Sequence, residues 1–255
     1  MLKNGSFEDG WTDMPPAPGY LINQQPNGWT LRWIEPGESL FDVGEKASGV
    51  PECVHKLSKQ LPANEQLGGS NALILDGDVV YKIFHFAGSF GTELKQTVTG
   101  LKPGSMAKLT VPVLAVTYDQ TDPYGTESGV WVNGEGEWRN GNDMKNRQWL
   151  YHNVEFEVPA NGTAVIEIRV KNKWPVKKDF FIDNITLDAE VDDGTSIPPT
   201  DDTSEAPVTS GPTTPTDEKV IRVSVPAGMN VITAVSNSED TVIITAPAGV
   251  KVVTE

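Results

Sequence analysis

The sequence predicts an all-β protein: an antiparallel β-sandwich over residues 1–190, an extended Thr/Pro-rich linker over 191–218 and a small β-rich module over 219–255. Three observations predict this. Short segments in which apolar and polar residues alternate recur along residues 1–190, with turn residues between them. The chain has 24 Gly and 19 Pro residues, which favour strands and turns over long helices. Residues 191–218 are acidic and rich in Pro and Thr, so they cannot bury a core of their own.

Each predicted strand is a short run of apolar or alternating residues bounded by Gly, Pro, Asn or Asp. The expected strands are 2–8, 28–34, 50–57, 70–77, 79–86, 92–98, 108–118, 128–133, 148–158, 163–170 and 178–188. Residues 58–69 are expected to form a polar loop with one helical turn, and residues 134–143 a Gly-rich loop. Pro103 and Gly104 occupy the central positions of a type II turn.

The last strand of this series, residues 178–188, closes the predicted sandwich. Phe181, Asp183, Ile185 and Leu187 share one parity, so a carboxylate lies in line with three apolar side chains. A carboxylate that faces a core is costly unless it is paired, hydrogen-bonded or bound to a cation. Asp183 therefore has a structural role that the pattern leaves open.

Composition excludes several classes of partner. The formal net charge is −15 and no basic patch is present, so nucleic acid and anionic membranes are poor partners. No apolar run approaches the roughly 20 residues of a membrane helix. Cys53 is the single cysteine, so no intrachain disulfide can form. The first residues lack a signal-peptide pattern, and we expect either a removed signal or release by another route, such as lysis of a virus-infected cell.

Residues 219–255 contain an internal repeat. Residues 223–232 align with 244–253, and each copy reads as strand, Pro-Ala-Gly turn and strand. A unit of this length lies below the roughly 40 residues that usually fold alone without a disulfide or metal. We therefore expect residues 191–255 to dock on the main domain, to self-associate or to bind neighbouring subunits.

Four sequence fragments, in this order, resemble the galactose-binding-like jelly rolls, and in particular the carbohydrate-binding modules of the xylan- and glucan-binding kind. The fragments are residues 2–8 (Leu-Lys-Asn-Gly-Ser-Phe-Glu), 26–29 (Pro-Asn-Gly-Trp), 94–104 (Leu-Lys-Gln-Thr-Val-Thr-Gly-Leu-Lys-Pro-Gly) and 181–187 (Phe-Ile-Asp-Asn-Ile-Thr-Leu). The resemblance covers residues 1–190. It implies a jelly-roll β-sandwich whose first and last segments lie side by side.

The resemblance also implies a structural calcium ion where those segments meet, with Glu8 and Asp183 at the positions that would supply carboxylates. Calcium is a hard cation that takes carboxylate and carbonyl oxygens. The alternative is that Asp183 accepts backbone N–H groups and Glu8 is solvated.

Sugar binding in such modules uses aromatic faces against pyranose rings, with polar side chains fixing the hydroxyls. Trp138 is the leading candidate, because polar groups flank it; packing as a loop anchor is the alternative. For Trp131 the alternative is core packing, whereas Trp29, Trp149 and Phe181 match core positions of the family. The full set of candidate ligand-binding residues is Trp33, Tyr118, Tyr124, Trp131, Trp138, Arg139, Asn140 and Trp174.

Catalytic patterns are absent from the sequence. The three histidines, His55, His85 and His152, form no metal-ligand spacing, and there is no GxSxG, P-loop or Rossmann pattern. Glu135 and Glu137 lie only two residues apart, which does not fit a glycosidase pair that must straddle a sugar. We therefore expect a protein that is not an enzyme.

Two functions fit the sequence. The first is a non-catalytic protein that binds a polysaccharide or cell-surface glycan. The second is a structural assembly protein, either a phage capsid decoration or tail protein or an extracellular filament subunit, whose tail and linker bind neighbouring subunits. Both place the protein outside the cell or on a virion surface.

Overall fold

The computed structural model describes residues 1–15, 22–41, 44–118, 120 and 122–192, and the backbone of four short strands between 221 and 254. The chain divides into two compact units, Met1–Pro198 and Pro199–Glu255, and each is described by itself. In the described residues no helix is both long and apolar enough to cross a membrane.

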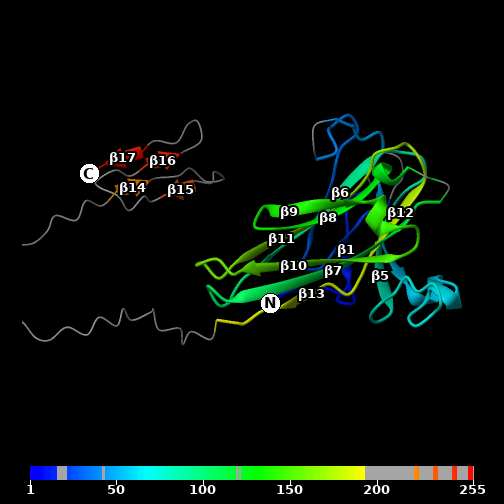
Figure 1. Ribbon diagram of the computed structural model, residues 1–255, viewed down its shortest axis with the longest axis horizontal. Coiled ribbons are helices and arrows are strands. Elements are labelled where there is room, and N and C mark those ends of the chain that lie inside the picture. Colours follow the sequence, from blue (N-terminus) through cyan, green and yellow to red (C-terminus); the bar gives the residue numbers. More distant parts are fainter. Residues whose placement is uncertain are drawn as a thin grey trace, which may run out of the picture. The chain divides into compact units, whose positions relative to one another are not determined.

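The first unit is an all-β sandwich of two antiparallel sheets, as the sequence predicts (Figure 1). The six-stranded sheet has the order β10-β7-β12-β5-β4, and β13 pairs with β7 beside it. Its strands are β10 (Trp149–Glu157), β7 (Met106–Val116), β12 (Lys178–Ile182), β5 (Val79–His85), β4 (Glu52–Leu57) and β13 (Thr186–Asp188).

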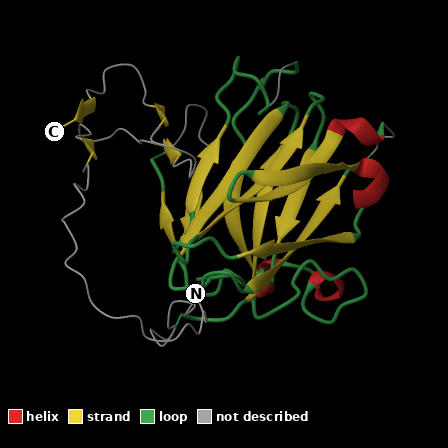
Figure 2. Cartoon of the chain, turned by 60° about the vertical axis from the view of Figure 1, so that its left-hand side comes forward, coloured by secondary structure: helices red, strands yellow, loops and turns green. Residues whose placement is uncertain are grey.

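The second sheet of the sandwich has five strands in the order β3-β6-β11-β8-β9. These are β3 (Thr30–Trp33), β6 (Phe90–Val98), β11 (Ala164–Asn172), β8 (Thr126–Val132) and β9 (Glu135–Asn140). A separate hairpin pairs β1 (Trp11–Asp13) with β2 (Gln24–Pro26). Helical turns within the described part are short and lie at the ends of the sandwich (Figure 2): η1 (Ser58–Gln60), η2 (Ala63–Glu65), η3 (Pro123–Gly125) and α1 (Gly141–Met144).

The main core fills the space between the two sheets because alternate residues of each strand point inward. From the five-stranded sheet, Leu94, Val130, Ile166 and Ile168 are buried in it. A smaller apolar cluster lies on the other face of the six-stranded sheet, where Leu73 and Ile74 cover Val80, Leu114, Val116 and Phe181. The six-stranded sheet is therefore packed against the main core on one face and partly against this smaller cluster on the other.

Two of the strand predictions are wrong. Residues 2–8 form turns, because Asn4 and Phe7 adopt positive φ angles of 50° and 61°, which no strand permits. Residues 70–77 also form no strand. Leu73 and Ile74 are buried, as an apolar run predicts. The N–H groups of Leu75 and Asp76 bond to a side chain, and those of Asn71 and Leu73 bond to carbonyl groups of η2, rather than to a neighbouring strand.

Two further differences concern element boundaries. The predicted loop 134–143 is instead the strand β9 followed by the single turn α1. The predicted closing strand 178–188 is two strands, β12 and β13, because Asn184 has a φ of 51° and breaks the ladder. The alternation assumed for residues 181–187 therefore does not hold across the break, although Asp183 is fully buried as predicted.

The first and last segments of the sandwich lie side by side, as the resemblance implies. The N–H of Ile185 donates to the carbonyl of Gly5 at 2.9 Å. A Cβ on Gly5 would collide with the backbone of Ile185, so only glycine permits this close approach.

The second unit contains four described strands, β14 (Ile221–Val223), β15 (Ile232–Ala234), β16 (Ile243–Thr245) and β17 (Val252–Thr254). They pair antiparallel as β14 with β17 and β15 with β16. Residues 193–220, which include most of the predicted linker, lie outside the described residues, as do the two Pro-Ala-Gly turns.

Candidate functional site

The outer face of the five-stranded sheet carries charged and aromatic side chains, whereas its inner face is apolar. Pairing register aligns these outward residues in rows across the strands. One row runs Lys95, Glu167, Trp131 and Gly136, and the next runs Glu93, Arg169, Gly129 and Trp138. Their chain neighbours Leu94, Val130, Ile166 and Ile168 lie in the core. Two faces of different chemistry follow directly from strand alternation.

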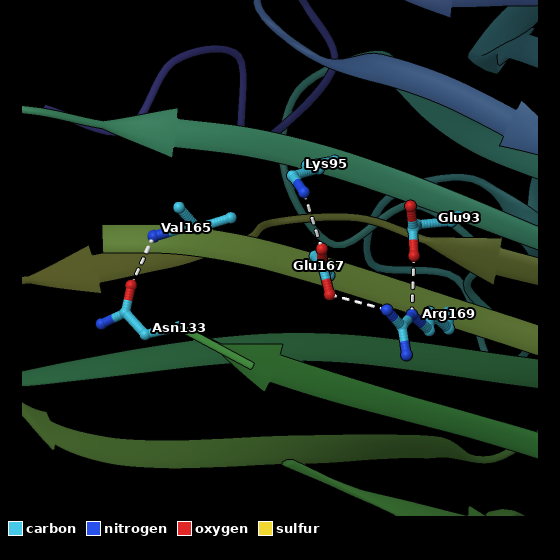
Figure 3. Close-up of polar contacts among 6 residues, drawn as sticks. All are labelled: Glu93, Lys95, Asn133, Val165, Glu167 and Arg169. Carbon is cyan, nitrogen blue, oxygen red and sulfur yellow. Dashed lines mark hydrogen bonds and ion pairs between the residues drawn. The ribbon is translucent and has the colours of Figure 1, made fainter. Parts of the chain in front are cut away.

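A network of ion pairs occupies the centre of this outer face (Figure 3). Lys95 Nζ lies 2.8 Å from Glu167 Oε1, and Arg169 Nη2 lies 2.7 Å from Glu167 Oε2. Arg169 Nε also donates to Glu93 Oε2 at 2.6 Å. The side chains of Glu93 and Arg169 are only 8% and 23% exposed. The network therefore holds its charged groups in fixed positions at the surface of the sheet.

A second set of ion pairs continues the pattern toward the end of β11. Lys171 Nζ lies 3.0 Å from Glu127 Oε2, and Lys173 Nζ lies 2.9 Å from Glu127 Oε1. Cations and carboxylates thus alternate across and along the strands, as favourable cross-strand pairing requires.

Two tryptophans contact each other beside this network. The rings of Trp131 and Trp138 are 4.8 Å apart and nearly perpendicular, at 71°. The Arg169 guanidinium lies 4.5 Å from the Trp131 ring centroid. A Cβ on Gly129 or on Gly136 would come within 2.6 Å of Trp131. These two glycines therefore let the indole lie against the sheet surface.

A loop covers one end of the same face. Phe41 is tilted against Trp138 with centroids 5.5 Å apart, and the Arg169 guanidinium lies 5.3 Å from the Phe41 ring centroid. Ile34, Leu40 and Phe41 pack in a small cluster over Gly91, where a Cβ would meet all three. Phe41, Trp131 and Trp138 form an aromatic group at the edge of the charged network, and we call this surface the aromatic-charged face.

The predicted ligand-binding residues lie in several separate parts of the sandwich. Two of them, Trp131 and Trp138, lie together on the aromatic-charged face. Trp33 lies on the edge strand β3, where its Nε1 donates to Glu35 at 2.9 Å. The Tyr118 hydroxyl donates a hydrogen bond to Asp179 at 2.8 Å. Tyr124 is 56% exposed in η3. Trp174 follows β11 and packs beside Gly125.

Arg139 has the opposite parity to Trp138 on β9, and Asn140 ends that strand. The carboxylates of Glu137 and Asp143 lie 3.3 and 3.8 Å from the Arg139 guanidinium, and the Asn140 side chain caps α1 by accepting from the N–H of Asn142. Arg139 lines a 340 Å³ groove between the edge strands β9 and β10, together with Tyr151, which is 51% exposed.

The predicted calcium ligands lie against one turn, residues 75–79. Glu8 Oε1 accepts the N–H groups of Asp78 and Val79 at 2.6 and 2.8 Å. Asp183 Oδ2 accepts those of Leu75 and Asp76 at 2.6 and 3.2 Å, and its Oδ1 accepts that of Asn184.

Backbone N–H groups therefore donate to Glu8 Oε1 and to both oxygens of Asp183. Burial raises the pKa of Asp183 to about 7, and the three N–H groups oppose that rise. Among the described residues, no group of three or more His, Cys, Asp or Glu side chains could hold a metal ion. The hydrogen bonds of Asp183 match the alternative, whereas Glu8 also accepts two N–H groups, and calcium at Glu8 and Asp183 stays a prediction.

Sequence reasoning missed several residues of the aromatic-charged face. Phe41 lies in a loop without periodicity, so nothing in the sequence signals its contact. Glu93, Lys95, Glu167 and Arg169 do carry a signal, because the alternation of β6 and β11 places them opposite the core residues. What the alternation cannot give is which strand lies beside which.

Comparison with known proteins concerns the fold of the first unit. No protein-family model matches the sequence, and neither does any curated protein. Among solved structures, a family 61 carbohydrate-binding module in complex with β-1,4-galactotriose is 17% identical, with a TM-score of 0.44 and coverage of 74% of this chain and 97% of that chain. A cyclase from Fischerella sp. TAU is 15% identical, with a TM-score of 0.44 and coverage of 75% and 96%.

The enzymatically active domain of tailspike protein 4 from bacteriophage CBA120 is 12% identical with a TM-score of 0.44, and this chain spans only 21% of it. Other carbohydrate-binding modules are among the matches. The chain is thus similar to several carbohydrate-binding modules, at identities and scores that concern the fold and leave function to the chain's own residues.

Proposed function

We propose that the aromatic-charged face binds a polysaccharide or cell-surface glycan, and that the protein is not an enzyme. The contact between Trp131 and Trp138 beside a fixed network of charged groups carries this proposal. An indole ring offers an apolar surface for the C–H face of a pyranose, and its edge remains polar. Carboxylate and guanidinium groups offer acceptors and donors for hydroxyls.

Preorganisation supports the same proposal. Arg169 is held by two carboxylates and by two aromatic rings, and Lys171 lies 4.1 Å from the Trp138 ring centroid. Side chains already fixed lose little conformational entropy when a ligand binds. The ligand therefore meets a surface whose hydrogen-bonding groups need little rearrangement.

A glycan array with wild type, Trp138→Ala and Trp131→Ala tests the proposal. We expect both variants to bind their best glycan at least about tenfold more weakly, a loss of about 1.4 kcal/mol. Phe86→Ala is the matched control, because Phe86 is an exposed aromatic residue that follows β5 of the other sheet, and it should bind like wild type. Absence of binding to every glycan, or equal loss in Phe86→Ala, would refute the assignment.

The structural-assembly alternative depends on residues 191–255. Most of these lie outside the described residues, so this alternative, the expected self-association and the extracellular or virion location stay predictions. Light scattering of the full chain and of residues 1–190 separates the two, since an assembly protein should lose its self-association with the tail.

A further inference from the structure

Lys178 is a lysine in the interior of the sandwich. It lies on the inner face of β12 with Phe180 and Ile182, and it is 0% exposed. Buried ammonium groups are normally paired with a carboxylate, because the charge is costly in an apolar surrounding. Within the described part of the chain, none of the ion pairs includes Lys178.

The side-chain partner of Lys178 is an amide. Lys178 Nζ contacts Gln120 Oε1, which also accepts a hydrogen bond from Thr126 Oγ1 at 3.2 Å. Gln120 Nε2 is buried and finds no hydrogen-bond acceptor among the described residues. Gly125 leaves the space that the Gln120 amide and the Trp174 ring occupy, since a Cβ there would collide with both. A fully buried amine is thus held beside an amide carbonyl and a hydroxyl.

Burial also prepares the amine for reaction. Desolvation lowers the pKa of Lys178 to about 8, although the nearby charge of Asp179 acts in the opposite direction. At neutral pH about a tenth of such amines carry a lone pair, far more than for a solvated lysine. Desolvation is one of the ways in which proteins make lysine nucleophilic.

We propose that Lys178 and Gln120 form an intramolecular isopeptide bond. The Nζ lone pair attacks Cδ of Gln120, and the Thr126 hydroxyl donates to Oε1, where negative charge develops. The Cδ–Nε2 bond then breaks, and Nε2 leaves as ammonia with a proton taken from the amine. Atoms balance without any other reactant. The product is a neutral secondary amide, which removes both a buried ammonium and an amide group that lacked an acceptor.

Proximity is the main contribution of the fold to this step. Holding the two groups in contact converts an encounter that is extremely slow in solution into a reaction within one molecule. The bond would join β12 to the segment between β7 and η3, and so fasten one end of the sandwich. This inference is independent of glycan binding, because Lys178 faces the interior and the aromatic-charged face lies on the outside of the other sheet.

Intact mass spectrometry of the full-length protein tests the proposal. Loss of ammonia lowers the mass by about 17 Da relative to the sequence, and digestion should yield one cross-linked peptide that contains Gln120 and Lys178. Lys178→Met and Gln120→Leu should each restore the sequence mass. Lys177→Met is the matched control, because it removes the neighbouring lysine and should keep the loss.

Cyclisation at an Asn-Gly pair, such as Asn133-Gly134, also releases ammonia, so the peptide map is required. A wild-type mass equal to that of the sequence overturns the proposal. So does a loss that persists in Lys178→Met or that maps to an Asn-Gly pair. If Lys178→Met fails to fold, the wild-type mass and its peptide map still decide the question.

Discussion

We expect the protein to lose stability in acid because of His152, and the loss in free energy of unfolding can be calculated. It lies on the inner side of β10, only 8% exposed, with its Nε2 2.8 Å from Ser128 Oγ in the facing sheet. Burial lowers the pKa of His152 to about 4, and the positive charge of Arg139 adds to this, while Asp143 opposes it. The folded protein therefore keeps this histidine neutral at a pH where the unfolded chain charges it.

The sign and magnitude follow from proton linkage. Between pH 6.5 and pH 4 the unfolded state binds more protons at this position than the folded state, so the free energy of unfolding falls as the pH falls. Well above pH 6.5 the residue is neutral in both states and contributes no pH dependence. With pKa values of about 6.5 and about 4, the loss at pH 4.5 is about 2.5 kcal/mol.

Urea unfolding of wild type and His152→Gln at pH 8 and pH 4.5 measures this loss. Glutamine can still bond to Ser128 but carries no titratable group, so the variant should lose about 2.5 kcal/mol less than wild type on acidification. His85→Gln is the control, because His85 is only half-buried and its change should be smaller. If wild type and His152→Gln lose equal stability between the two pH values, the linkage argument is wrong.

Three further predictions concern the sheet and the turn beside it. Arg169→Met leaves the nearly buried Glu93 without its main partner and should lower the free energy of unfolding by about 2 kcal/mol, less than for a fully buried pair because Arg169 is partly exposed. Gly129→Ala places a Cβ within 2.6 Å of Trp131 and should lower stability by about 1–3 kcal/mol and alter the near-UV circular dichroism of the indole. Replacing calcium with EDTA decides between the two readings of Asp183: the hydrogen-bonded alternative predicts an unchanged melting temperature, since a ligand that does not bind cannot shift folding.

Controls sharpen these three measurements. Lys102→Met breaks an ion pair with Glu190 in which both side chains are about half exposed, and it should cost less than about 0.5 kcal/mol. If Lys102→Met lowers the free energy of unfolding as much as Arg169→Met does, the burial of an ion pair does not determine how much it stabilises this protein. Native near-UV spectra for Gly129→Ala would contradict the packing of Trp131. A melting temperature that rises with calcium would establish the metal that the resemblance implies.

The sequence predicts the sandwich better than it predicts the face that carries the site. Strands such as β6 and β11 alternate cleanly, and both were placed correctly from that pattern. The segment that carries Trp138 was predicted to be a loop because glycines dominate it. The missed signal is Asn133-Gly134, whose φ angles of 54° and 87° form the tight turn of a hairpin between β8 and β9.

Pairing across strands explains why the site was only partly predicted. Trp131 and Trp138 were both candidates, yet their contact depends on register, which sets Gly136 opposite Trp131 and Gly129 opposite Trp138. The charged network depends on the order β3-β6-β11-β8-β9, which joins segments more than 70 residues apart. Local sequence gives the face on which a side chain lies, whereas non-local pairing decides which side chain lies beside it.

The two carboxylates near the chain's first and last segments show the same division between local and non-local information. The sequence identified Asp183 as a carboxylate that must be satisfied inside the protein, because apolar residues surround it. It could not identify the partner, since the N–H groups come from residues 75 and 76, more than 100 positions away. Those N–H groups are available because the apolar run ahead of them forms no strand. An error in predicting that strand and the open question about Asp183 therefore have one physical cause: a turn held by a side chain where a ladder was expected.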